Sequence, residues 1–160
     1  MEKITYRKLF KEDKTWINEF IKEHWGSNKI VVHKAVYFPY KLEGFLAETK
    51  KERIGLVTFN IKNKKCEIVT LDSIKENKGI GTQLINLVLK EANERGCNII
   101  WLITTNDNIK GMYFYQKLGF RLVKVYPDAV NESRKLKPEI PLVSENGIQI
   151  RDELEFVLKM

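Results

Sequence analysis

Two glycines one residue apart are the residues of this sequence with the clearest chemical use. They lie in ENKGIGTQLINLVLKEANERG, residues 76–96, between a strand-like run and a long amphipathic pattern. Glycine lets the backbone approach a ligand closely, and the first N–H groups of a helix have no partner within the helix. Such a loop therefore suits a phosphate group, to which the Thr82 hydroxyl can also donate. A tight turn without a ligand is the alternative.

Three kinds of phosphate loop can be compared with this segment. A P-loop needs Lys directly after its last glycine, whereas Thr82 and Gln83 follow Gly81. A dinucleotide fingerprint needs a third glycine where this chain has Leu84. The third kind has a G-x-G between a strand and a helix and binds a pyrophosphate through backbone N–H groups. The glycine loop of this chain fits the third kind best.

The elements that must position this loop alternate between strand-like and helix-like patterns. We expect strands at 4–10, 45–51, 53–62, 65–74, 98–105, 120–127 and 148–160. We expect helices at 13–26, from the glycine loop to about residue 94, and at 108–119. Segment 29–44 is ambiguous between irregular structure and a short helix, and 128–148 is expected to be a loop. This order predicts an α/β protein of the α+β type, with one mixed sheet and helices on both faces.

Composition limits the classes of protein to consider. The chain has 160 residues, 43% of them apolar, which suits a single domain over 1–160. Two cysteines without metal-type spacing favour a reducing cytoplasm, and no stretch resembles a signal peptide or a membrane helix. The net charge of +7 is spread along the chain, so it indicates a solvated basic surface or attraction for a small anion. Neither nucleic acid nor a membrane is an expected partner.

A second motif lies downstream of the glycine loop. It is NIKGMYFYQKLGF, residues 108–120. Together, GIGTQL (79–84) and YQKLGF (115–120) resemble, in content, order and separation, the GNAT superfamily of N-acetyltransferases. The resemblance covers 45–126 well, the first 44 residues loosely and the tail after 127 not at all. It implies a mostly antiparallel central sheet and acetyl transfer from acetyl-CoA to a primary amine, by direct attack in a ternary complex.

The resemblance also implies where acetyl-CoA would bind. The loop and helix start would hold the diphosphate through Lys78, Gly79, Ile80, Gly81 and Thr82. Asn108 would contact the pantetheine arm, cap the helix at 108–119, or do both. The backbones of Val69 and Leu71 would line a gap between two splayed strands, with the Leu71 N–H donating to the thioester carbonyl. Glu76 stands where the family has Gln or Arg, and we expect it to face solvent or to pair with Lys75 or Lys78.

The catalytic residues follow from the same resemblance. Tyr115 would protonate the departing thiolate, because an ordinary phenol is protonated at neutral pH. Without the resemblance, a core aromatic would be the simpler interpretation of MYFY. Glu67 would accept the proton of the amine, directly or through a water, since alternation puts it on the same face as Val69 and Leu71. A surface glutamate and a solvent base are the alternatives, and Asp72 is expected on the opposite face.

The resemblance also implies that the acceptor would lie between the first helix and the loop that joins the last two strands. Trp25, His33 and Glu153 are the candidates for contacting it, although a core position is the simpler interpretation of Trp25. His24 is expected to be structural. Acidic Asp152, Glu153 and Glu155 would favour a cationic amine, or are ordinary strand charges. Basic Arg134, Lys135 and Lys137 would favour an anionic acceptor, or are solvated.

These conflicting charges leave a small molecule and a peptide open as acceptors. A homodimer is compatible with the family. The alternative function is a catalytically silent acetyl-CoA sensor or interaction module on the same fold.

Overall fold

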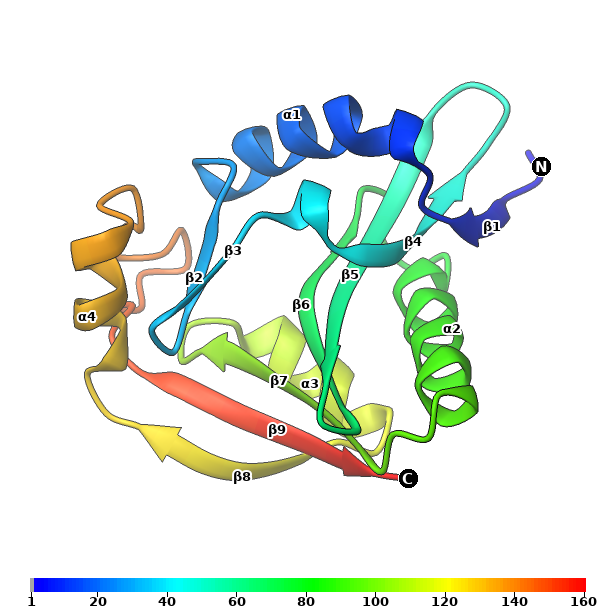
Figure 1. Ribbon diagram of the computed structural model, residues 1–160. Coiled ribbons are helices and arrows are strands. Elements are labelled where there is room, and N and C mark those ends of the chain that lie inside the picture. The colour runs from blue at the N-terminus through cyan, green and yellow to red at the C-terminus, as the bar shows by residue number, and fades with distance from the viewer. Residues whose placement is uncertain (1) are drawn as a thin grey trace.

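The computed structural model describes residues 2–160, and a seven-stranded sheet forms its centre (Figure 1). The strands lie in the order β1 Thr5–Lys8, β4 Glu43–Glu48, β5 Arg53–Lys62, β6 Lys65–Ser73, β7 Ile99–Thr105, β9 Glu153–Lys159 and β8 Arg121–Tyr126. Neighbouring strands are antiparallel except β6 and β7, which are parallel. The predicted mixed, mostly antiparallel sheet is therefore confirmed.

Helices cover both faces of this sheet, as expected. The helices are α1 Lys14–Trp25, α2 Ile80–Glu94, α3 Ile109–Lys117 and α4 Ala129–Leu136, with short 3-10 turns at Lys11–Asp13 and Pro39–Lys41. α1 packs on one face, whereas α2 and α3 pack on the other (Figure 1). Every helix in residues 2–160 is too short or too polar to cross a bilayer.

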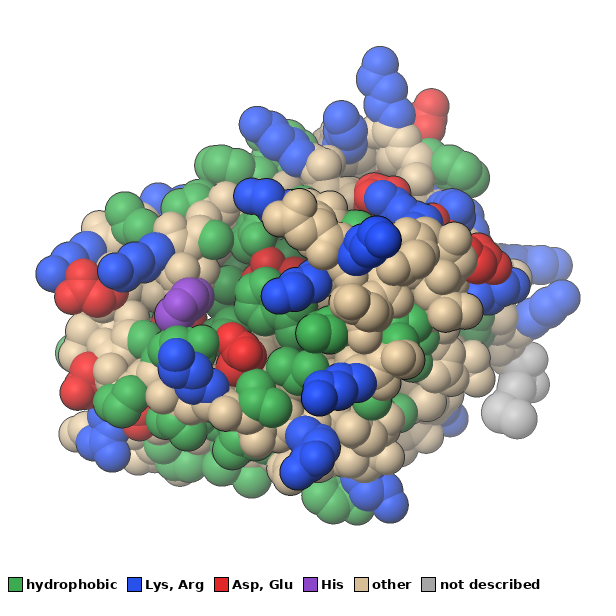
Figure 2. Space-filling view, turned by 60° about the horizontal axis from the view of Figure 1, so that its bottom comes forward, with side chains coloured by type: hydrophobic (Ala, Val, Ile, Leu, Met, Phe, Trp, Pro, Cys, Tyr) green, Lys and Arg blue, Asp and Glu red, His purple; other side chains and the backbone are tan. Residues whose placement is uncertain are grey.

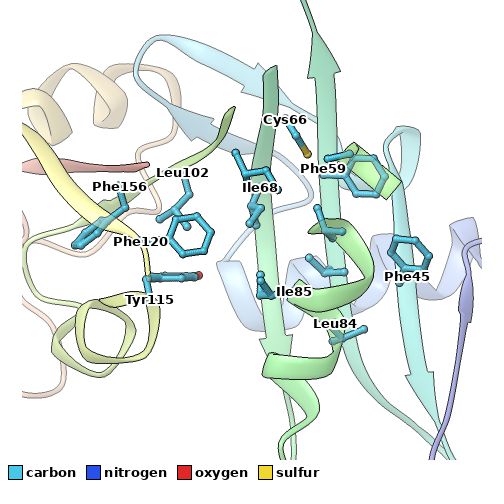
Figure 3. Packing of buried hydrophobic residues seen from close by; sticks show 14 of the residues in the cluster. Phe45, Phe59, Cys66, Ile68, Leu84, Ile85, Leu102, Tyr115, Phe120 and Phe156 are labelled. Carbon is cyan, nitrogen blue, oxygen red and sulfur yellow. The ribbon is translucent and has the colours of Figure 1, made fainter. Parts of the chain in front are cut away.

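Two apolar cores lie on the two faces. The larger core joins α2 and α3 to the sheet and includes Leu84, Ile85, Tyr115, Phe120 and Phe156 (Figure 3). The smaller core joins α1 to the sheet through Ile17, Phe20, Ile21, Leu46 and Leu56. Figure 2 shows Lys and Arg side chains scattered over the face in view rather than gathered in one tract.

The strands β6 and β7 separate after a short ladder. Their register pairs Lys65 with Ile99, Cys66 with Ile100 and Glu67 with Trp101, and no further pair joins them in the described chain. β6 also carries a β-bulge, because Thr58 of β5 pairs with Thr70 whereas Phe59 pairs with Ile68. Val69 is the extra residue, and an extra residue reverses the alternation of side chains beyond it. The separation opens the sheet, and the bulge decides which side chains face each side.

Two segments differ from the sequence-based expectation. Segment 29–44 contains a hairpin of β2 Ile30–Val32 and β3 Ala35–Tyr37, closed by a turn in which His33 and Lys34 both have positive φ. Three-residue strands are too short to show alternation, which is why the pattern looked irregular. Segment 128–148 contains α4, whose polar sequence shows few apolar residues. The last strand begins at Glu153 rather than at residue 148.

Candidate active site

A cavity of about 340 Å³ lies where β6 and β7 separate. Strands β6 and β7, the end of α1 and the start of α3 contribute its walls. The residues lining it include His24, Trp25, Val69, Leu71, Asp72, Thr104, Asn108 and Tyr115. The structure thus brings together several residues that lie far apart in the sequence and were predicted to act together.

Tyr115 is the phenol of this cavity. Its ring packs edge-on against Phe114 and Phe120, with centroids 5.3 and 5.8 Å away, and its hydroxyl is directed toward β6 (Figure 3). No partner for this hydroxyl is found among residues 2–160. Burial, and then the charge of Asp72, raise the pKa of Tyr115 well above its ordinary value. The group is therefore a protonated phenol at neutral pH, although it is also part of the larger core.

Asp72 faces the same cavity, which corrects the expectation that it points to the opposite face from Glu67. The bulge at Val69 is the reason. Glu67 and Asp72 are five positions apart, so in a regular strand their side chains would point to opposite faces, and the extra residue brings them to the same face. Trp25 Nε1 donates to both carboxylate oxygens of Asp72 at 3.2 Å. Burial raises the pKa of Asp72 to about 6, partly opposed by this hydrogen bond. A carboxylate that titrates near neutrality is suited to accepting a proton.

Leu71 also departs from the predicted pattern. Its side chain packs against the larger core, on the side of α2 and α3, whereas Val69 packs on the side of α1. The same bulge explains this difference. Both residues still line the cavity, so their predicted role through backbone groups does not depend on where the side chains point.

Glu67 lies deeper than Asp72. Its carboxylate accepts a 2.5 Å hydrogen bond from the hydroxyl of Tyr37 in β3, and only 5% of the residue is exposed. Burial raises the pKa of Glu67, while the hydrogen bond from Tyr37 lowers it. Glu67 lines neither this cavity nor the larger one described below. Tyr37 is a partner that the sequence did not indicate, because it lies in the segment expected to be irregular.

The glycine loop ends directly at α2. Gly79 has a φ of 70° and forms the N-cap of the helix, and the first helical hydrogen bond runs from the Gln83 N–H to the Gly79 carbonyl at 3.0 Å. The N–H groups of Ile80, Gly81 and Thr82 therefore have no acceptor within the helix. A Cβ on Gly81 would lie 3.2 Å from the Phe114 ring. The free N–H groups on which the prediction of an anion site depends are therefore present at the start of α2, and the Phe114 ring lies beside Gly81.

Two charged side chains just before the glycines form ion pairs with residues outside the loop. Glu76 is exposed, as expected, but its ion pair is with Lys110 at 3.5 Å and not with Lys75 or Lys78. Lys75 instead pairs with Glu52 at 2.7 Å. Lys78 is exposed beside the loop. The carboxylate of Glu76 is thus drawn toward a lysine of α3, which lessens its conflict with a bound anion.

Asn108 is the N-cap of α3, as expected. Its Oδ1 accepts from the Gly111 N–H at 3.1 Å, and its Nδ2 donates to the Thr104 hydroxyl at 2.9 Å. A Cβ at position 111 would lie 2.2 Å from Asn108 Nδ2, which explains the glycine there. The cap holds Asn108 at the cavity wall, near the predicted path of the pantetheine arm.

A larger cavity of about 790 Å³ adjoins the first one. The lining residues common to both are His24, Trp25, Val69, Ile103, Thr104 and Asn108. Trp25 and Glu153, two predicted acceptor residues, line the larger cavity. Trp25 is 36% exposed and is therefore a wall rather than a core residue.

The third predicted acceptor residue, His33, supports Glu153 from the hairpin. The backbone N–H of His33 donates to Glu153 Oε2 at 2.9 Å, and the centroid of its ring lies 4.3 Å from that of Tyr126. His24 stacks on Phe20 at 4.0 Å, and its Nδ1 lies 2.9 Å from the Phe20 carbonyl oxygen. His24 thus has the structural packing expected of it, although it also borders both cavities.

Comparison with known proteins supports the inference from motif and geometry. The family model for the acetyltransferase (GNAT) family matches residues 7–120. The uncharacterized protein YdhI of Bacillus subtilis (strain 168) is 46% identical over 144 residues, which cover 89% of this chain and 90% of YdhI.

Two solved structures share the fold. An IAA acetyltransferase from Bacillus cereus ATCC 14579 matches with a TM-score of 0.75 at 19% identity, over 99% of this chain and 100% of its own. A GNAT family acetyltransferase from Elizabethkingia anophelis with acetyl-CoA bound matches with a TM-score of 0.69 at 21% identity, over 98% of each chain. With the family model covering most of the sequence, these matches lead to one conclusion: the chain belongs to the GNAT family of acetyltransferases.

Proposed function

We propose that this protein transfers the acetyl group of acetyl-CoA to a primary amine, which attacks the thioester directly in a ternary complex. The observation that carries the proposal is the placing of the Tyr115 phenol and the Asp72 carboxylate on one cavity where β6 and β7 separate. The chain supplies a proton donor and a proton acceptor there, next to a helix N-terminus with free N–H groups.

The residues present fit the coenzyme. The N–H groups of Ile80, Gly81 and Thr82 would hold its diphosphate, and Gly81 leaves room that a Cβ would fill beside Phe114. Lys78 adds positive charge to the loop. The unpaired edge of β6 would offer the backbone groups of Val69 and Leu71, and Asn108 lies on the facing wall. When bound, acetyl-CoA would supply an activated acetyl group as a thioester.

Two residues would move protons in this reaction. Tyr115 holds the proton that the departing thiolate needs, because burial keeps its phenol protonated at neutral pH. Asp72 would take the proton that the ammonium must lose before its nitrogen can attack. Glu67, the base suggested by the sequence, would act only through Tyr37 or a water, since it lines neither cavity.

The experiment compares release of the CoA thiol by the wild type, Tyr115→Phe and Tyr113→Phe across a panel of amines. We expect Tyr115→Phe to lower turnover by about two orders of magnitude, because it removes the proton donor. Its affinity for CoA, measured by calorimetry, should stay unchanged. Tyr113→Phe is the matched control, since Tyr113 is 68% exposed on the same helix. Equal turnover in the three proteins would remove Tyr115 from the mechanism.

The same panel tests the alternative of a silent acetyl-CoA-binding module. The feature that favours that alternative is Glu76, because its carboxylate would repel a diphosphate if it faced the loop. Its exposed position and its ion pair with Lys110 weaken that objection. Binding of CoA without amine-dependent thiol release for any acceptor would support the silent module and overturn the transferase.

A further inference from the structure

The larger cavity contains a buried lysine that the proposed reaction does not use. Lys137 follows the last residue of α4, lines this cavity and is only 4% exposed. Its Nζ lies 6.0 Å from the ring centroid of Trp25. No ion pair to Lys137 is found among residues 2–160. A buried ammonium without an ion pair is costly, so its presence in a cavity wall needs an explanation.

Ser133 lies one helical turn before Lys137 and shares its surroundings. It is 3% exposed and lines the same cavity, and its hydroxyl makes no hydrogen bond within the described part of the chain. Residues four apart lie on the same face of a helix. An unpaired ammonium and an unpaired hydroxyl therefore sit together on one wall, where both can donate to one acceptor group.

Two buried carboxylates line other parts of the two adjoining cavities. Glu153 is 2% exposed and lines the larger cavity, while Asp72 lines the adjoining smaller one. Neither carboxylate forms an ion pair with Lys137 in the described residues. Burial lowers the pKa of Lys137, whereas exposed Glu139, which also lines this cavity, raises it and Lys29 lowers it further. The buried charges are thus separated, with a cation at α4 and anions at the sheet.

We propose that the acceptor is an amine that also carries a carboxylate, as an amino acid does, and that Lys137 and Ser133 bind that carboxylate. This proposal depends on the proposed function, because the amine must reach the space beside Asp72 and Tyr115. One ammonium balances one carboxylate, whereas a phosphate dianion would keep an unbalanced charge. A volume of about 790 Å³ suits a small molecule. An acceptor with both charges would complement both walls at once.

The first experiment measures kcat/KM for α-, β- and γ-amino acids and for their carboxamides. Wild type should prefer the carboxylate in matched pairs by about tenfold or more. Lys137→Met keeps the length of the side chain without its charge and should abolish this preference, by lowering kcat/KM for the amino acids far more than for their carboxamides. Ser133→Ala should reduce the preference less. Lys135→Met is the control, since Lys135 is exposed on the same helix and pairs with Glu132 at 3.1 Å.

The second experiment tests binding of the carboxylate separately from acetyl transfer, so that this proposal and the proposed transferase activity can fail independently. Calorimetry would measure binding of the N-acetylated amino acids and of their N-acetylated carboxamides, which need no catalysis. Binding of the carboxylates to wild type but not to Lys137→Met would support the proposal even if no amine were acetylated. Acetylation of carboxamides as fast as of amino acids would overturn it while leaving the transferase intact. Absence of carboxylate binding in wild type would also overturn the proposal. If Lys137→Met does not fold, Ser133→Ala replaces it in both experiments.

Discussion

At the scale of residues, the choice of base depends on where two carboxylates lie. Asp72 borders the cavity that contains Tyr115, and its pKa is raised to about 6. Glu67 is nearer to the paired end of β6 and β7 and is held by Tyr37. Asp72 is the carboxylate that can reach an amine in the cavity, so its ionisation should control the reaction.

This assignment predicts a specific pH profile for kcat/KM toward the amine. Below about pH 6, Asp72 is protonated and cannot take the proton of the ammonium, so the logarithm of kcat/KM should rise with a slope of about 1. Above that pH, Asp72 is ionised and accepts the proton of the ammonium, so kcat/KM should level off below the pKa of the amine. The measurement is initial rates of thiol release from pH 5 to 9.

Two variants separate the carboxylates. Asp72→Asn should give a slope near 1 throughout the range below the pKa of the amine, together with a lower kcat, because the ammonium must then lose its proton to the solvent. Glu67→Gln should keep the change of slope near pH 6. If Glu67→Gln removed the change of slope and Asp72→Asn kept it, the roles would be exchanged.

At the scale of elements, an ion-pair cluster around the buried Asp13 ties the N-terminal segments to the sheet. Asp13 is 2% exposed and precedes α1, and it accepts from Arg7 of β1 at 2.8 and 3.0 Å. Arg7 also donates to Glu48 of β4, and Arg53 of β5 lies 3.5 Å from Asp13. The start of α1, β1 and β5 therefore meet at the Asp13 carboxylate, and β4 joins them through Arg7.

This cluster predicts how stability depends on acid. The hydrogen bond from Arg7 lowers the pKa of Asp13 to about 2, below its ordinary value in the unfolded chain. Its contribution is therefore complete above about pH 4 and is lost as the pH falls toward 2, with a size of up to about 2 kcal/mol. Urea unfolding from pH 2 to 7 should show a smaller acid-dependent loss for Asp13→Asn than for wild type.

The neighbouring Glu12 provides the control for this measurement. Glu12→Gln removes an exposed carboxylate from the same turn, so its pH dependence should match that of wild type. Asp13→Asn should also be less stable at pH 7, because Arg7 and Arg53 lose their buried partner. Identical curves for all three proteins would show that the cluster does not contribute.

The elements that the sequence predicted well are those with long patterns. The helix at 13–26 and the strands at 53–62 and 65–74 have enough residues for their periods to be visible, and Gly26 ends α1 with a φ of 83°. The hairpin β2–β3 has strands of three residues, and α4 is mostly polar. Contacts such as that from the Val130 N–H to the Arg151 carbonyl hold α4 in place, and no local pattern reveals them.

At the scale of the whole molecule, binding of coenzyme should stabilise the fold. A ligand at 100 times its dissociation constant adds about 2.7 kcal/mol to the free energy of unfolding. For a chain of this size, that corresponds to a rise in Tm of roughly 5–10 °C. Differential scanning fluorimetry with CoA would measure it.

Gly81→Val tests whether the stabilisation arises at the glycine loop. The added side chain would meet Phe114 and occupy the approach to the free N–H groups, so the rise in Tm should largely disappear. Asn86→Val makes a similar change at an exposed position of α2 and should keep the full rise. A full rise in Gly81→Val would place the coenzyme elsewhere.

The site was predictable only where a motif carried it. The glycine loop, Asn108 and Tyr115 were indicated by the resemblance; Asn108 and Tyr115 line the cavity at the separation of β6 and β7, and the loop leads from the end of β6 into α2. The position of Asp72 was not predictable, because a β-bulge leaves no mark in an alternating pattern. Lys137 was visible only as one of several basic residues, since the sequence does not show which of them is buried.

The bulge at Val69 changes which residues of β6 face each side of the sheet. Before it, odd-numbered side chains such as Glu67 face α1; after it, even-numbered ones such as Asp72 do. Deleting Val69 alone would remove the bulge but leave Leu71 and Asp72 on their present faces, because the pairs of Phe59 with Ile68 and of Thr58 with Thr70 would become consecutive. Inserting one residue after Thr70 would instead reverse the alternation beyond it, turning Asp72 toward the side of α2 and Leu71 toward the side of α1. A single added codon would therefore inactivate the protein while every functional residue remained in its sequence.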